Sequence, residues 1–261
     1  MKLDYCYHTH TYRCGHAKGT DEEYVLNAIK MGIKRLGFSD HIIFKDLKQP
    51  GIRASYEMLE DYLSSIKALK EKYKDQIDII IGFEAEYYEE YKDYYQELLD
   101  NKVVDYLILG QHFYLENGRF NRYFYKDAPI KNAVKYTNDL VKGIKSGLFT
   151  YVAHPDLFIN PYKKWTFTLI RCAKKILKAC EEMKVPIEVN IGGFRWKYAF
   201  TETEYPSKVF FELSKKYDVD VVIGVDAHNP VDFNIEDAYK ALEFVKDHNL
   251  RFIEDYKIKK D

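Results

Sequence analysis

Short apolar runs alternate with longer amphipathic segments from one end of the chain to the other. The runs at 77–83 (IDIIIGF) and 219–225 (VDVVIGV) are apolar at nearly every position, which is typical of strands covered on both faces of a parallel sheet. The strands predicted from this pattern are Leu3–Tyr7, Arg35–Ser39, Ile77–Glu84, Tyr106–Gly110, Thr150–Ala153, Pro186–Asn190 and Val219–Val225.

The segments between these strands have the apolar spacing of helices that bury one face. Thr20 precedes three acidic residues, as a helix N-cap does, and Gly32 and Gly147 stand where helix C-caps are expected. The predicted helices are Glu22–Met31, Tyr56–Lys74, Glu90–Asp100, Pro129–Ser146, Phe167–Met183, Ser207–Lys216 and Ile235–His248.

Regular alternation of strands and helices predicts an α/β fold with parallel strands and right-handed crossovers. The strand–helix units follow one another without a linker, a repeat of fixed period or a low-complexity tract, which favours a closed barrel over an open sheet. We therefore expect a single domain over residues 1–261. The segments Lys45–Ser55 and Tyr114–Asp127 are long enough to cover one rim of such a barrel.

Composition and charge narrow the class of partner. Hydrophobic residues make up 46% and charged residues 31% of the chain, and the net charge is −1 with both signs scattered. This balance does not suggest a binding surface for nucleic acid or for a membrane. Because the N-terminus has no apolar signal region and no 18-residue apolar run occurs, we expect a cytoplasmic protein with free thiols at its four cysteines.

The histidines are concentrated where the predicted strands end. His8 and His10 follow the first strand, and residues i and i+2 of an extended chain face the same side. Taken alone, this pair is equally consistent with half of a metal site and with a chance pair in a polar loop. Among the eight histidines of the chain, the following seven lie at or just after a strand end: His8, His10, His16, His41, His112, His154 and His228.

Carboxylates occur at the same strand ends. Asp40 precedes His41, Glu84 ends the third strand, and Asp226 ends the seventh. Glu84 or its neighbour Glu86 could instead be an exposed strand-end acid, and Asp40 or Asp226 a helix cap. Neutral imidazoles combined with carboxylates suit Zn²⁺, Mn²⁺ or Fe²⁺, and paired ions of this kind serve phosphoester hydrolysis.

Two further side chains near these strand ends have structural alternatives. Asp156 is expected to cap the turn that follows it, and Cys14 could be a metal ligand or a group beside one. The chain lacks the GxSxG, GxxxxGK[ST] and GxGxxG patterns, so serine hydrolases, P-loop enzymes and dinucleotide binders are not the leading hypotheses.

Several short blocks in this order resemble the polymerase and histidinol phosphatase (PHP) superfamily. The matching blocks are HTH at 8–10, CGHAKGT at 14–20, FSDH at 38–41, GFEAE at 82–86, GQH at 110–112, AHPD at 153–156, EVN at 188–190 and GVDAH at 224–228. The resemblance implies a single-domain, distorted (β/α)7 TIM-like barrel with a trinuclear metal site. The CGHAKGT and EVNIGGFR blocks are most similar to the histidinol-phosphate phosphatase branch.

The resemblance also implies how the ligands are divided. A first metal would be held by His8, His10, Glu84 and Asp226, and Glu84 would bridge to a second metal held by His112 and His154. His16, His41 and His228 would hold the third. Asp40 would either orient a ligand or replace His41, and the block FSDH leaves both possibilities open.

The implied reaction is the hydrolysis of L-histidinol phosphate to L-histidinol and phosphate in histidine biosynthesis, by a hydroxide that bridges two metals. Arg195 is the main candidate for an additional phosphate clamp, since a guanidinium binds phosphate bidentately. Gln111 departs from the family's small-residue pattern and is a candidate substrate contact, and Asp40 is a candidate acid for the leaving group. Weaker candidate cations are Arg13, Lys18, Arg53, Arg119 and Arg122.

Other functions remain open at this point. A PHP phosphoesterase acting on nucleotides or nucleic acid, similar to an exonuclease, would have the same ligands, although the near-neutral charge and the lack of a basic-aromatic groove disfavour it. A metal-dependent amidohydrolase usually needs a lysine at a strand end, which the predicted strands lack. A non-catalytic metal-binding protein would be expected to have lost part of the ligand set. The oligomeric state is left undetermined.

Overall fold

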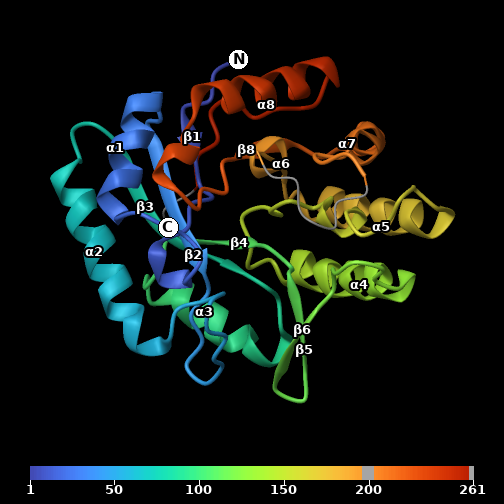
Figure 1. Ribbon diagram of the computed structural model, residues 1–261, viewed down its shortest axis with the longest axis horizontal. Helices are drawn as coiled ribbons and strands as arrows, with labels where there is room; N and C mark the ends of the chain where they lie inside the picture. The colour runs from blue at the N-terminus through green and yellow to red at the C-terminus, as the bar shows by residue number, and fades with distance from the viewer. Residues whose placement is uncertain (196–202, 259–261) are drawn as a thin grey trace.

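Parallel strands form the centre of the molecule, and helices surround them (Figure 1). The computed structural model describes residues 1–195 and 203–258. One sheet has the order β1 (Tyr5–Cys6), β2 (Arg35–His41), β3 (Asp78–Ala85) and β4 (Tyr106–Leu109), and β7 (Ile187–Asn190) pairs with β8 (Val221–Gly224). All pairs in these two sheets are parallel, as the apolar runs predicted.

The helices occupy nearly the predicted segments. Their bounds are α1 Asp21–Met31, α2 Leu59–Lys72, α3 Lys92–Asp100, α4 Ile130–Ser146, α5 Phe167–Met183, α6 Gly192–Arg195, α7 Lys208–Ser214 and α8 Ile235–Asp247. Thr20 accepts a hydrogen bond from the Glu23 amide in a capping box, and Gly32 and Gly147 adopt positive φ at the ends of their helices. The predicted caps at these positions are therefore confirmed.

Isolated parallel bridges connect the two sheets into one curled arrangement. Leu109 pairs with Val152, Val152 pairs with Ile187, and Thr9 pairs with Ala227. The predicted strand Thr150–Ala153 is thus reduced to bridges at Val152. The chain turns directly afterwards, and the sheet pairing is shortened there.

Tyrosine rings and small residues fill the interior at the strands. The ring of Tyr106 occupies the space beside two glycines, because a Cβ added to Gly37 or Gly82 would lie 2.2 or 2.5 Å from it. Its hydroxyl donates to the carbonyl of Tyr7 at 2.9 Å, and the hydroxyl of Tyr62 donates to the carbonyl of Gly82 at 2.8 Å. The first hydroxyl links β4 to the segment after β1 across the interior, and the second links α2 to β3, so both buried hydroxyls are paired.

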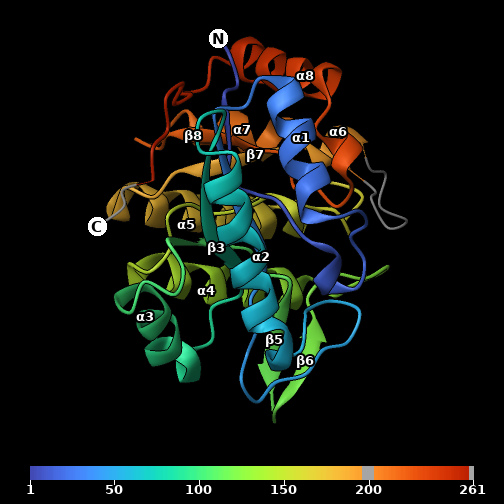
Figure 2. The ribbon, with the colours of Figure 1, turned by 90° about the vertical axis from the view of Figure 1, so that its left-hand side faces the viewer.

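Two segments project from the carboxyl ends of the strands, where rim-covering loops were expected. Most of an antiparallel hairpin, β5 (Phe113–Glu116) and β6 (Arg119–Arg122), lies in the segment Tyr114–Asp127, where no strand was predicted. Figure 2 shows this hairpin below the helices, with the connection between β2 and α2 beside it. The guanidinium of Arg53, on that connection, lies 4.9 Å from the ring centroid of Phe120 on the hairpin.

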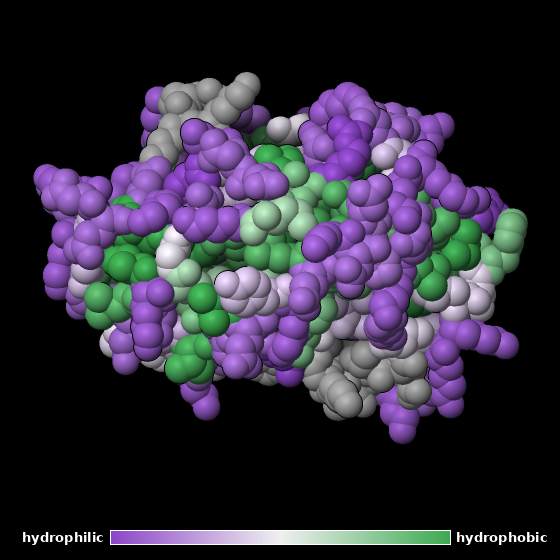
Figure 3. Space-filling model, turned by 90° about the horizontal axis from the view of Figure 1, so that it is seen from above, coloured by the Kyte–Doolittle hydropathy of each residue, from purple (hydrophilic) through white to green (hydrophobic). Residues whose placement is uncertain are grey.

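The outer surface is mainly polar. Figure 3 shows hydrophilic side chains over most of one face, with hydrophobic ones visible between them. Helices that present a polar face outwards and an apolar face to a sheet produce this surface. Within residues 1–195 and 203–258, no helix combines the length and apolar character needed to cross a bilayer.

Candidate metal centre

The predicted histidine and carboxylate ligands converge at the carboxyl ends of the strands. They come from segments far apart in the chain, and most of their side chains are buried. Both strand-end glutamates, Glu84 and Glu86, are buried, so the alternative of an exposed acid is wrong for both. The residues that the structure brings together are His8, His10, His16, His41, Glu84, His112, His154, Asp226 and His228.

The first group consists of His8, His10, Asp226 and Glu84. The Nε2 atoms of His8 and His10 are 3.3 Å apart, and they lie 3.5 and 3.3 Å from Oδ1 of Asp226. Glu84 contributes Oε1 at 3.6 Å from His8 and Oε2 at 3.4 Å from His10. Ligand atoms bound at about 2.0–2.2 Å around a tetrahedral ion lie about 3.3–3.6 Å apart, so these separations fit one ion.

The second group shares Glu84 with the first. Oε1 of Glu84 lies 2.7 Å from Nε2 of His154 and 3.4 Å from Nε2 of His112, and these two nitrogens are 3.2 Å apart. One carboxylate therefore contacts the ligand atoms of both groups. This is the arrangement expected of a residue that bridges two ions.

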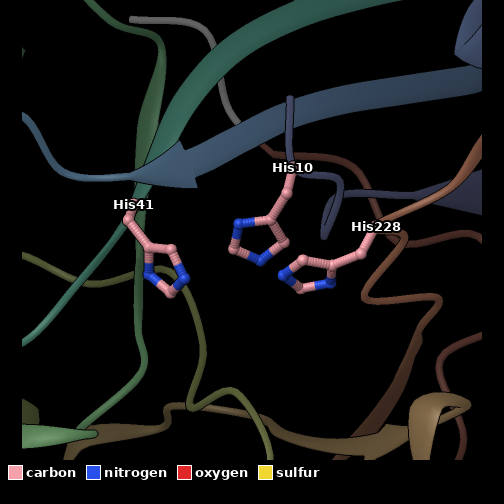
Figure 4. Close-up of side chains that lie close together, drawn as sticks. All are labelled: His10, His41 and His228. Carbon is pink, nitrogen blue, oxygen red and sulfur yellow. The ribbon is translucent and has the colours of Figure 1, made fainter. Parts of the chain in front are cut away.

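A third group lies beside the first. The Nε2 atoms of His16 and His228 are 3.1 Å apart, and the rings of His10 and His228 stack with centroids 4.1 Å apart. Figure 4 shows the rings of His10, His41 and His228 turned toward a common region, and their ligand atoms lie within 4.8 Å of one another. Nδ1 of His41 is also 3.2 Å from Oε2 of Glu84, so Glu84 contacts this group too.

Asp40 and Cys14 lie beside these ligands: Sγ of Cys14 lies within 4.8 Å of ligand atoms of His16 and His228, and likewise of His10 and Asp40. Oδ1 of Asp40 accepts a hydrogen bond from the His41 amide at 2.8 Å and faces Nδ1 of His10 at 3.4 Å. Its other oxygen accepts from the hydroxyl of Thr11. Cys14 accepts a hydrogen bond from the Ala17 amide, and burial raises the pKa of its thiol to about 12.

Glu188 contacts two of the candidate ligands, although the strand-end pattern of the sequence did not single it out. Its Oε1 lies 2.8 Å from Nδ1 of His8, and its Oε2 accepts from the His154 amide and from the side chain of Asn190, both at 2.9 Å. A carboxylate on one ring nitrogen keeps the other free to bind a metal. The only signal for it was its place in the EVN block, where an acid interrupts a buried apolar strand.

The carboxylates and histidines shift each other's protonation. Burial would raise the pKa of Glu84, but the neighbouring His112 and His8 hold it well below its usual value. Burial would lower the pKa of His10, whereas Asp226 and Asp40 raise it to about 9. Because a proton and a metal ion compete for these nitrogens, metal affinity is expected to fall as the pH falls.

Two of the candidate ligands have a positive backbone φ, His154 at 32° and Asp226 at 51°. Arg195 holds the second of these segments, since its guanidinium donates to the carbonyls of Val225 at 2.7 Å and Asp226 at 3.2 Å. Its Nε lies 3.5 Å from a carboxylate oxygen of Asp232. The structure thus places Arg195 against the backbone of Asp226, and its role as a phosphate clamp stays a prediction.

A cavity of about 300 Å³ opens over the three groups. Its walls combine the histidines and carboxylates with apolar side chains and one cation; the non-ligand residues that line it are Ile52, Phe113, Arg122, Phe124, Leu157 and Gly192. Of the predicted cations, Arg122 is the one that the described residues place in this lining. Arg13 is paired with Asp21 and Asp61 instead.

The other two predicted substrate contacts lie outside this lining. The amide of Gln111 is occupied by protein groups: it accepts from the Tyr87 amide and donates to the carbonyl of Phe113 and the hydroxyl of Tyr123. Lys18 is exposed, and its amide donates to the carbonyl of His228 at 2.8 Å. The side-chain roles proposed for these two residues therefore stay predictions.

The expected role of Asp156 as a cap is wrong. It occupies the N-cap position of the 3-10 turn Leu157–Ile159, but its side chain makes no capping hydrogen bond there. Its Oδ2 instead accepts from the Ser207 amide at 2.6 Å, just before α7. The buried carboxylate links two distant segments, a contact that local sequence does not reveal.

Gly110 provides a direct test of the position of Glu84. A Cβ at Gly110 would lie 1.9 Å from Oε1 of Glu84, so Gly110→Ala should displace this carboxylate. We expect the kcat/KM for phosphate release from a phosphomonoester to fall at least about 100-fold. The control is Gly32→Ala, where a Cβ meets nothing within 4 Å and only the positive φ makes the change unfavourable. Phosphate release is compared at equal fractions of folded protein. Normal activity in Gly110→Ala as well as in Gly32→Ala would contradict the role of Glu84 as a metal ligand.

The donor set fits divalent metal ions. Nδ1 of His41 is buried without a hydrogen-bond partner and lies 3.2 Å from Oε2 of Glu84, on the side of the other ligand atoms. Imidazoles and carboxylates gathered at metal-ligand separations are the donors that Zn²⁺, Mn²⁺ and Fe²⁺ take in proteins. The described residues that would hold such ions are those of the three groups above.

Two histidinol-phosphatases resemble this chain in sequence over nearly its whole length. The chain is 27% identical over 256 residues to a probable histidinol-phosphatase of Deinococcus radiodurans, covering 94% of this chain and 95% of that one. It is 25% identical over 263 residues to the histidinol-phosphatase of Bacillus subtilis, covering 90% and 96%.

A solved structure shows a related fold. It is the histidinol phosphate phosphatase of Lactococcus lactis complexed with Zn, L-histidinol and phosphate, with a TM-score of 0.75, 21% identity, and coverage of 97% of this chain and 96% of that chain. The model of the PHP domain family matches residues 7–192, which is most of the chain. This protein therefore belongs to the PHP domain family.

Proposed function

We propose that this protein is a metal-dependent histidinol-phosphatase, which hydrolyses L-histidinol phosphate to L-histidinol and phosphate. The observation that carries the proposal is Glu84, whose two carboxylate oxygens contact ligand atoms of all three groups under one cavity. The names of the relatives support the choice of substrate within the phosphomonoesters.

We further propose that the three groups hold three divalent ions. The first ion would be bound by His8, His10, Glu84 and Asp226, and the second by Glu84, His112 and His154. The third would be bound by His16, His41 and His228. Bound ions of this kind activate water and neutralise charge on a phosphoryl group.

The protein's own residues would then bind and orient the substrate. Arg122 lies in the cavity lining and is a second candidate, besides Arg195, for contact with the phosphate. The apolar walls at Phe113 and Phe124 would take the histidinol portion, since an imidazole ring packs well against aromatic rings. Asp40 is proposed to orient His10 and His41; its part as the acid for the leaving group stays open.

The fold proposed for this function is the distorted (β/α)7 barrel. The pairings β1–β2–β3–β4 continue through Val152 to β7 and β8, and the bridge between Thr9 and Ala227 joins the last strand to the first. A closed ring of parallel strands brings all carboxyl ends to one rim, where barrels of this type carry their active sites.

The substrate assignment predicts a clear preference in phosphate release. Protein purified with Mn²⁺ or Zn²⁺ should hydrolyse L-histidinol phosphate with a kcat/KM at least about 100-fold above that for p-nitrophenyl phosphate, because the cavity walls bind the histidinol portion. A dinucleotide diester should be a poorer substrate still. Equal rates for the two monoesters would contradict the assignment, and preference for the diester would favour a PHP nuclease.

A further inference from the structure

The turn at residues 49–53 lies on the rim and contains no candidate metal ligand, but it contacts groups beside several of them. The guanidinium of Arg53 donates through Nε to Oε1 of Gln49 at 2.9 Å and through Nη1 to the carbonyl of Ile42 at 3.1 Å. Its Nη2 donates to both oxygens of Glu86, at 3.2 and 3.0 Å. Ile42 directly follows His41, so this one side chain joins the turn to the end of β2 and to the segment after β3.

Glu86 leads from Arg53 to the second group. Its carboxylate is buried and faces Nδ1 of His112 at 3.6 Å. An anion beside Nδ1 favours the tautomer with its proton there, which leaves Nε2 of His112 free on the side of Glu84.

The turn itself leads to the third group. The Arg53 amide donates to the carbonyl of Gln49 at 3.1 Å, so Arg53 binds Gln49 through both main chain and side chain. Between them, Gly51 has a φ of 79°, and its carbonyl lies 3.1 Å from Nδ1 of His16. A proton on that Nδ1 donates to Gly51 and leaves Nε2 of His16 facing His228.

Arg53 has no direct access to substrate. Its side chain is 0% exposed and does not line the cavity. The guanidinium lies between two aromatic rings, 5.3 Å from the centroid of Phe44 and 4.9 Å from that of Phe120. Any effect on the reaction must pass through the residues that it holds.

We propose that Arg53 is a positioning residue for two metal positions at once. It orients His112 through Glu86. It orients His16 through its bonds to Gln49, which hold the turn that carries the Gly51 carbonyl. The inference rests on the proposed function in one respect, that the three groups bind divalent ions. It assigns a role to residues that the ligand pattern does not include.

The experiment measures metal binding and does not depend on turnover. The apoprotein is prepared with a chelator and titrated with Zn²⁺ by calorimetry and with Co²⁺ by its visible absorption, which reports ligand geometry. Glu86→Gln should weaken the binding of one ion about tenfold to a hundredfold, and Arg53→Lys should weaken two. Arg35→Lys is the matched control, since Arg35 pairs with Asp4 at the opposite end of β2.

The two arms of the proposal can fail separately. Arg53→Lys with folded structure, all affinities within twofold of the wild type and an unchanged Co²⁺ spectrum would overturn it. If Arg53→Lys weakens only the ion that Glu86→Gln also weakens, the proposed effect of Arg53 on His16 is refuted.

If Arg53→Lys does not fold, Gln49→Ala tests the effect on His16 instead. This variant should weaken the binding of a different ion from the one that Glu86→Gln weakens, and unchanged metal affinity would refute the effect on His16. A wild-type chain that binds no divalent ion would refute the proposed function first.

Discussion

Glu84→Gln is expected to lower kcat/KM for histidinol phosphate at least about 1,000-fold, which corresponds to about 4 kcal/mol of lost transition-state stabilisation. The two oxygens of Glu84 contact His154 at 2.7 Å and His41 at 3.2 Å, so both are in use. Glutamine keeps the shape but loses the negative charge, and it turns one acceptor into a donor. Ions on either side would lose their shared ligand.

The measurement is steady-state phosphate release, together with elemental analysis of the purified variant. Glu90→Gln is the control, because it removes the same charge from an exposed position just before α3. Glu90→Gln should keep the wild-type activity and unfold at nearly the wild-type temperature, since the substitution is isosteric and the side chain is exposed. Near-normal turnover with a full complement of metal would show that Glu84 is not the bridge.

Removal of metal is expected to abolish activity and to destabilise the fold. The cluster gathers several buried carboxylates with histidines, and ions neutralise charge that would otherwise be buried. An ion present at 1,000 times its Kd stabilises the folded state by about 4 kcal/mol. In a chain of this size, such a loss lowers Tm by roughly 10 °C.

Thermal unfolding and activity should be followed before chelation, after it, and after Zn²⁺ or Mn²⁺ is returned. Both signals should recover on return of the ion, and Glu84→Gln should show a smaller shift in Tm. Elemental analysis of protein never exposed to chelator should find three ions per chain. One ion per chain would refute the trinuclear proposal, and full activity in metal-free protein would refute the metal mechanism.

The order of strands and helices could be predicted because each element depends on local periodicity. The helix Phe167–Met183 occurs at its predicted bounds; the apolar run at 77–83 forms most of β3, and the run at 219–225 contains β8. The strand predicted at Thr150–Ala153 was too long because sheet pairing there ends at single bridges. The hairpin after His112 was not predicted, since the mixed composition of the segment Tyr114–Asp127 has no clear period.

The sequence alone predicted which histidines and acids gather at the candidate site, with Glu188 as the exception. Parallel strands in one sheet end at one edge, so histidines and acids at successive strand ends must lie near one another. That argument predicted the nearness of His16 and His228, which are separated by 212 positions. The pair His8 and His10 by itself left a metal site and a chance pair equally open, and the family resemblance implied that both are ligands.

Only the tertiary structure decided what each side chain contacts. Glu188 supports His8, Arg53 binds Glu86, and Gln111 is held by protein groups away from the cavity lining. These contacts depend on how neighbouring strands are staggered, how the sheet curls and which rotamers the packing allows. Periodicity gives the face on which a residue lies, whereas its partner comes from another part of the chain.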